Sequence, residues 1–205
     1  MKINGCLEWM FFVTLLIVVN AANSATTTTT GVPQAAQSPD SSKHYTVSGG
    51  SLDFWALVQP SSLKVHGTTS DMTGSMNQNK NVLSGFLEVP LKNFETGMAV
   101  RNSHLKEKVF ETDKYDKAKL SITELKIPDG KTGEIKDLPF TGTLSLHGVD
   151  KPITGTVILT VGDKTISFEA TTEIQYSDFN IPVQKFTMMT VQQPVKIVAK
   201  GDAKL

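Results

Sequence analysis

The fold is indicated most clearly by Ile153-Thr-Gly-Thr-Val-Ile-Leu-Thr-Val161, in which apolar and polar side chains alternate. The apolar face of this run carries Ile153, Val157, Leu159 and Val161. Thr165 to Tyr176 repeats the alternation after Gly162-Asp163, with Ile166, Phe168, Ala170 and Ile174 on its apolar face. Because successive side chains of a strand point to opposite faces, both runs predict half-buried strands, and the Gly-Asp pair predicts the turn between them.

Further strands are predicted on both sides of this pair. Shorter runs with the same character lie at residues 52–58, 63–66, 86–91, 120–127, 140–147 and 191–199. Turn residues separate several of them, most sharply in Pro128-Asp-Gly130, because proline fixes φ and glycine accepts a positive φ. Pro90 removes a backbone donor from an otherwise good strand, so we expect a sheet edge or a bulge there.

One stretch departs from the period of two. Asn102 to Phe110 begins with residues that favour a helix N-terminus and places Leu105 and Val109 four positions apart, which predicts one short helix. About eight strands with a single insert are best accommodated by closing the sheet, since closure removes exposed edges. The predicted fold class is all-β, an antiparallel barrel with one short helical insert, and a two-sheet sandwich is the competing architecture.

The N-terminus has the composition of an export signal. Met10 to Val19 is apolar apart from Thr14, is shorter than a bilayer span of about 20 residues, and is followed by small residues up to Ala25. We expect a signal peptide at 1–25, a disordered leader at 26–43 and the barrel domain at 44–205. The chain is therefore expected to be exported, either to the periplasm or out of the cell.

Several function classes are disfavoured by charge and spacing. Lys and Arg number 20, as do Asp and Glu, so net charge gives no reason to expect a nucleic-acid partner. The histidines lie on separate segments, and His104 with Glu107 makes only half of a zinc site, so no metal site is predicted. Ser61-Ser-Leu-Lys64 and Lys131-Thr-Gly133 imitate motifs of penicillin-recognising enzymes, but no Ser-Asp-Asn lies between them. We predict no catalytic residue and no enzymatic activity.

Three segments carry a likeness to a known family. The first is Phe94 to Leu105, with Thr-Gly, then Arg-Asn, then His-Leu; the second is Phe140 to Pro152, with Gly-Thr-Leu-Ser-Leu-His-Gly-Val-Asp-Lys-Pro; the third is Ile174 to Phe179. Together they resemble the YceI family of exported lipocalin-like proteins, and the second segment is the most specific. The chain departs from the family pattern at Tyr176, where the family usually has Arg.

The resemblance implies an eight-stranded antiparallel lipocalin-like barrel that holds a polyisoprenoid or similar lipid. Eight strands leave an interior that is either filled by side chains or just wide enough for one slender ligand. Two functions therefore stay open: non-catalytic carriage of a long apolar or amphiphilic molecule in the cell envelope, and a solid-core structural or stress-related role without ligand. No cofactor is expected, although an isoprenoid quinone would suit the first function. Transient membrane contact and a homodimer also stay open.

The candidate ligand-binding residues have inward parity on the predicted strands or lie in the helical motif. They are Phe54, Leu87, Val89, Leu91, Arg101, His104, Leu144, Leu146, Phe168 and Ile174. Arg101 is the only arginine in the sequence, and its planar fork of donors either ties the helix to a loop, such as the one that holds Asp178, or contacts a ligand head group. For His104 a structural hydrogen bond is favoured over metal ligation.

Overall fold

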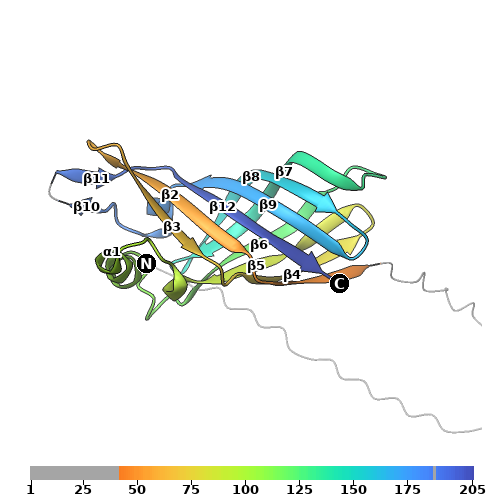
Figure 1. The fold of residues 1–205 in the computed structure, drawn as a ribbon, viewed down its shortest axis with the longest axis horizontal. Coiled ribbons are helices and arrows are strands. Elements are labelled where there is room, and N and C mark those ends of the chain that lie inside the picture. Colours follow the sequence, from red (N-terminus) through yellow and green to blue (C-terminus); the bar gives the residue numbers. More distant parts are fainter. Residues whose placement is uncertain (1–41, 187) are drawn as a thin grey trace, which may run out of the picture. The chain divides into compact units, whose positions relative to one another are not determined.

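The computed structural model describes residues 42–186 and 188–205, so the predicted signal peptide and nearly all of the predicted leader lie outside the described residues. Antiparallel strands dominate the described chain (Figure 1). The long strands are β1 (Lys43–Ser48), β2 (Ser51–Gln59), β3 (Leu63–Thr69), β4 (Thr73–Asn79), β5 (Val82–Pro90), β6 (Lys117–Lys126), β7 (Gly133–Leu146), β8 (Val149–Val161), β9 (Thr165–Ile174) and β12 (Val195–Lys204). Two short strands, β10 (Lys185–Phe186) and β11 (Met189–Val191), complete the set.

The sheet closes on itself through β1. This strand pairs with β4 along its whole length and with the end of β12 at Thr46 and Val47. The closed circuit runs β1-β4-β5-β6-β7-β8-β9-β12, all antiparallel, and every strand in it has two neighbours. The predicted eight-stranded antiparallel barrel is confirmed, and the two-sheet sandwich was wrong.

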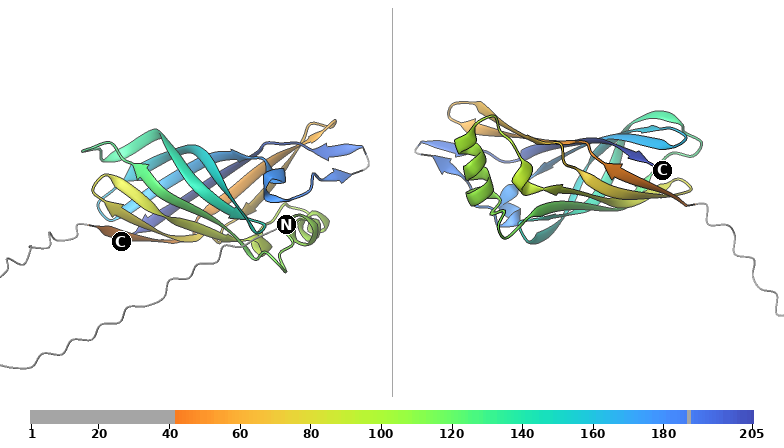
Figure 2. Two further views of the ribbon diagram at one scale, coloured as in Figure 1. Left: turned by 180° about the vertical axis from the view of Figure 1, so that it is seen from behind. Right: turned by 60° about the horizontal axis from the view of Figure 1, so that its bottom comes forward.

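The β2–β3 hairpin extends the barrel wall at one end. The chain bends between β1 and β2 at Gly49 and Gly50, and β2 then pairs with β12, β3 and β11. Gly50 has φ +136°, and a Cβ there would lie 2.5 Å from the carbonyl oxygen of Lys200, so the bend requires glycine. The hairpin, β10–β11 and the helix gather at the same end of the barrel in Figures 1 and 2.

The helical insert covers an opening in the sheet. β3 has only β2 as a strand partner, and the last residues of β5, Val89 and Pro90, pair only with β6. Pro90 therefore lies at a local sheet edge, where its missing donor costs nothing, in agreement with the prediction. The opening is spanned by a 3₁₀ turn η1 (Leu91–Asn93), α1 (Ala99–His104) and a π-helical turn η2 (Leu105–Val109). Backbone hydrogen bonds in both directions between Thr68 and Glu95, each 2.9 Å, tie this segment to β3.

The helix begins three residues earlier than predicted. Asn102 was expected to start it, but the helix starts at Ala99 and Met98 contributes no side-chain cap. The Asn102 side chain instead accepts hydrogen bonds from the backbone N–H and the hydroxyl of Thr96, both at 2.7 Å. Its amide also donates to the Glu95 carboxylate. Asn102 thus fixes the loop before the helix rather than the helix N-terminus.

Candidate ligand-binding cavity

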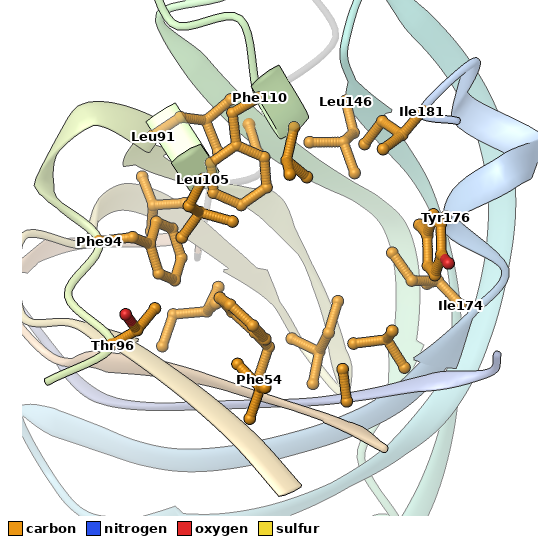
Figure 3. A pocket seen from close by; sticks show the side chains of 18 of the residues that line it. Phe54, Leu91, Phe94, Thr96, Leu105, Phe110, Leu146, Ile174, Tyr176 and Ile181 are labelled. Atoms are coloured by element: carbon orange, nitrogen blue, oxygen red, sulfur yellow. The ribbon is translucent and has the colours of Figure 1, made fainter. Parts of the chain in front are cut away.

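An elongated cavity of about 500 Å³ occupies the half of the barrel that faces the helical insert. Its walls come from β2, β3, β5, β6, β7, β8, β9, β11 and β12 together with the insert, and Figure 3 shows side chains of the lining pointing into one space. Nearly all lining side chains are apolar; the polar ones are Thr96, Arg101, His104, Lys119, Thr172, Tyr176 and Gln184. The interior is therefore hollow at this end and almost without hydrogen-bonding groups.

Small side chains at inward positions make this room. Ala56, Ala118, Ala170 and Ala199 all line the cavity, each from a different strand. An alanine where a leucine would fit leaves the volume of several methyl groups unfilled, and four walls contribute such gaps. The cavity thus results from small side chains on the inner face of the barrel and not only from the number of strands.

The other half of the barrel is packed solid. It contains several of the most deeply buried side chains, among them Tyr45, Val47, Leu159 and Ile166, none more than 1% exposed. A second, much smaller void of about 40 Å³ lies there, bordered by Leu159 and Phe168 among others. The described part of the barrel is thus packed more densely in this half than around the main cavity.

The structure brings most of the predicted site residues to this cavity. Those that line it are Phe54, Leu87, Val89, Leu91, Arg101, His104, Leu144, Leu146 and Ile174. Phe168 lies instead at the small void in the packed half, because the period of two identifies the face of a strand but not the depth along the barrel. That the lining residues contact a ligand stays a prediction.

An aromatic wall was not predicted. Phe94 and Phe110 flank the helical insert and, with Leu105, close the side of the cavity next to Phe54 (Figure 3). The ring centroids of Phe54 and Phe94 lie 5.6 Å apart, as do those of Phe94 and Phe110 in an edge-to-face contact. Both phenylalanines lie at or beside the motif that resembled the family, which was the signal available in the sequence.

Arg101 lies at the mouth of the cavity and is held by the loop before its own helix. One guanidinium nitrogen donates to the backbone carbonyl of Thr96 at 3.3 Å, and the other lies 3.0 Å from the Met98 sulfur. No hydrogen bond or ion pair joins Arg101 to Asp178, so the alternative in which it ties the helix to that loop is wrong. None of the ion pairs among residues 42–186 and 188–205 includes Arg101; Glu95, on the same loop, pairs with Lys106 and accepts a hydrogen bond from the Asn102 amide.

Two polar contacts bind the segment after β9 to the rest of the mouth. The His104 ring lies 3.0 Å from the side-chain oxygen of Gln184, which is the structural hydrogen bond expected for this histidine. The Tyr176 hydroxyl donates to the carbonyl of Val191 at 3.0 Å, and burial raises the pKa of Tyr176. Tyr176, which stands where the family usually has Arg, lines the cavity beside Ile174 (Figure 3). In the described part of the chain, no three His, Cys, Asp or Glu side chains converge as a metal site would require.

Comparison with known proteins identifies the family. The family model of the YceI-like domain matches residues 39–203. This chain belongs to the YceI-like family. Among the relatives of this YceI-like chain, a UPF0312 protein of Enterobacter sp. (strain 638) is 35% identical over 127 residues, and protein YceI of Escherichia coli O17:K52:H18 is 34% identical over 127 residues. Each match covers 57% of this chain and 63% of the relative, so the matched part of the YceI-like chain spans less than two thirds of those relatives.

Solved structures share the fold of this YceI-like chain at low sequence identity. A polyisoprenoid binding domain from Saccharophagus degradans, implicated in plant cell wall breakdown, superposes with a TM-score of 0.63 at 16% identity over 78% of this chain and 97% of that domain. BcnA of Burkholderia cenocepacia superposes with a TM-score of 0.59 at 18% identity over 75% of this chain and 96% of BcnA. At such identities the comparison establishes the barrel fold. No helix among residues 42–186 and 188–205 is long and apolar enough to cross a bilayer.

Proposed function

We propose that this YceI-like protein binds one long apolar or amphiphilic molecule, of the polyisoprenoid class or a similar lipid, and catalyses no reaction. The observation that carries the proposal is the apolar cavity of about 500 Å³ in one half of the barrel. Its volume falls within the range of about 300–1,000 Å³ that is typical of small-molecule sites. The domain from Saccharophagus degradans with the same fold, which binds polyisoprenoid, supports this ligand class.

A bound apolar molecule is favoured because neither an empty cavity nor water would satisfy the apolar side chains that line it. Leaving an apolar space of about 500 Å³ unfilled forgoes the contacts that a bound molecule would make, which in enclosed cavities are worth about 24 cal/mol per Å³. Water would find few partners, because the lining is almost entirely apolar. A flexible hydrocarbon chain restores the packing contacts, and each methylene group that it buries contributes about 0.8 kcal/mol.

The polar groups are placed for an amphiphile whose head stays at the mouth. Arg101 offers donors there and has no carboxylate partner, whereas the interior beyond it offers hydrocarbon surroundings. A ligand with a polar or anionic head and an apolar tail matches this gradient. An isoprenoid quinone has the same polarity pattern with a neutral head. We place this activity in the cell envelope on the basis of the export signal expected at residues 1–25.

Extraction of the purified protein tests the proposal. The full chain is purified from the cells in which it is made, extracted with organic solvent, and the extract is examined by mass spectrometry. We expect one lipid class in roughly equimolar amount, absent from a parallel preparation of an unrelated exported protein. Recovery of no specific lipid, together with failure of the extracted protein to bind the fluorescent probe N-phenyl-1-naphthylamine, would favour the alternative of an envelope protein without ligand.

A further inference from the structure

The large apolar side chains that the described barrel leaves exposed are concentrated around the cavity mouth. Leu205, at the C-terminus, is the exception. The others lie on three segments, here called the mouth rim: residues 57–64 at the β2–β3 tip, residues 96–101 at α1, and residues 182–186 with 188–191 around β10 and β11. They are Leu57, Leu63, Met98, Val100, Val183, Met188 and Met189. Val100 and Met188 are the extremes, at 82% and 85% exposed.

These three segments are linked to one another and are not three separate patches. β11 pairs with β2 through Val191 and Val58, which joins the β10–β11 hairpin to the β2–β3 tip. The His104–Gln184 contact at 3.0 Å joins the same region to α1. Leu63, Met98, Val100 and Met189 belong both to the exposed set and to the lining of the cavity. Figure 2 shows the three segments at the same end of the barrel from two directions. The linked segments therefore border the entrance to the apolar compartment.

The mouth rim also differs from the rest of the chain in charge. Its three segments contain Lys64, Arg101 and Lys185 and no Asp or Glu, although acidic and basic residues are equal in number in the whole sequence. Glu95, the residue before the second segment, is paired with Lys106 at 3.3 Å. Lys64 and Lys185 are exposed. An apolar rim with only cations is complementary to a surface that offers hydrocarbon behind a layer of negative charge.

We propose that the mouth rim docks onto the surface of an anionic lipid bilayer. This inference rests on the proposed function and deepens it, because docking would let an apolar ligand pass between bilayer and cavity without crossing water. Apolar side chains on separate tips can each enter the interfacial region of a bilayer, which adapts to their spacing, whereas a rigid protein partner would need a matching surface around an open hole. The cations stay at the level of the head groups.

A reporter at the rim tests insertion directly. In a Cys6→Ser background of the full chain, Val100→Cys carries an environment-sensitive NBD dye, and Leu205→Cys, at the other end of the barrel, is the matched control. Vesicles of phosphatidylcholine with phosphatidylglycerol should shift the emission at position 100 to shorter wavelength and increase it, with little change at position 205. Residues 1–41 lead into β1, which pairs with Ala203 and Lys204 beside position 205. Binding through that region would therefore change the reporter at position 205 at least as much as the reporter at position 100. No change at position 100, or equal changes at both positions, would overturn the proposal.

The cations supply a second and independent test. Each cation near an anionic bilayer surface contributes about 1 kcal/mol, which is about fivefold in partitioning. Lys64→Gln with Lys185→Gln should therefore weaken co-sedimentation with the anionic vesicles by up to about 25-fold. Lys131→Gln with Lys164→Gln removes the same charge at the other end and should change it little. Equal losses in the two variants would refute rim docking.

The remaining outcomes separate the two proposals. If rim variants lose vesicle binding while the protein still contains its lipid, both proposals stand. If the reporter shows no insertion but the lipid is present, docking is wrong and the proposed function survives. If the reporter shows insertion but no lipid is extracted and no probe binds, the proposed function is wrong. If the rim variants instead abolish a dimer seen by analytical ultracentrifugation, the rim is an interface between copies of this chain and the bilayer proposal is overturned.

Discussion

Replacing Leu144 by tryptophan distinguishes a hollow interior from a packed one. Leu144 lies on β7, is 9% exposed and lines the cavity of about 500 Å³. If the interior around it were as dense as a protein core, the added ring would cost about 1–3 kcal/mol. For a chain of this size that corresponds to a fall of about 2–12 °C in the midpoint of thermal unfolding.

The structure predicts a different outcome, because the indole can extend into the cavity. The stability of the extracted protein should change by less than about 1 kcal/mol. The ring takes the room of about two to four methylene groups of ligand, and at about 0.8 kcal/mol each this lowers ligand binding by about 1.6–3.2 kcal/mol. The expected loss of affinity is therefore about 15-fold to 200-fold.

Leu159→Trp provides the matched control in the packed half. Leu159 is 1% exposed and borders only the void of about 40 Å³, so the same substitution should overpack it and lower the midpoint strongly. Both variants are compared with the parent by thermal unfolding after lipid extraction and by titration with N-phenyl-1-naphthylamine. A Leu144→Trp variant that is as destabilised as Leu159→Trp while its probe affinity equals that of the parent would refute the account of the cavity.

Three further predictions concern single polar groups. Arg101→Lys keeps the charge but loses the planar fork of donors. In fluorescence titrations it should weaken binding of cis-parinaric acid about fivefold and leave binding of the corresponding neutral alcohol unchanged. Equal effects on both probes would exclude a contact between Arg101 and the ligand head group. Burial raises the pKa of Tyr45 and of Tyr176 above 10.0, so their contribution to stability is complete below that pH and is lost as the pH rises through their folded-state pKa values. Thermal midpoints followed from neutral pH to above pH 10 should accordingly fall less steeply in Tyr45→Phe with Tyr176→Phe than in the parent, and identical slopes would contradict this. Both ring nitrogens of the buried His147 lack a hydrogen-bond partner, and the Glu111 carboxylate lies 3.8 Å from the ring. His147→Phe should therefore leave the midpoint of thermal unfolding unchanged or raise it by about 2–4 °C. A clear fall of the midpoint would mean that the pair with Glu111 is stabilising.

Much of the barrel was predictable because alternation is a direct consequence of strand geometry. Leu87 on β5 and Leu144 on β7 were placed on the inner face from parity alone, and both line the cavity. β1 and β4 were missed. β4 reads Thr-Gly-Ser-Met-Asn-Gln-Asn, in which Met76 is the only large apolar side chain, so its pairing with β1 and β5 overrides a weak local pattern.

Which face of a strand a residue lies on predicts neither its position along the barrel axis nor whether the space beside it is filled. Phe168 has the inward parity that was assigned to it but lies in the packed half, because the tilt and stagger of neighbouring strands decide which rows share a level. The small inward residues Ala56 and Ala199 were present in the sequence, yet alanine contributes to a cavity only when other small residues face it across the barrel. The role of Asn102 was likewise not predictable from the sequence, because the same side chain can cap a helix or hydrogen-bond to the preceding loop.

The central claim, that the hollow half of the barrel holds one lipid molecule, is tested most directly by native mass spectrometry of the protein as purified. The account predicts a population heavier than the polypeptide by the mass of a single long apolar molecule, a return to the polypeptide mass after organic extraction, and a much smaller bound population in Leu144→Trp. A parent protein that shows only the polypeptide mass, and that gains no mass when incubated with geranylgeraniol or with a long-chain quinone, would contradict it.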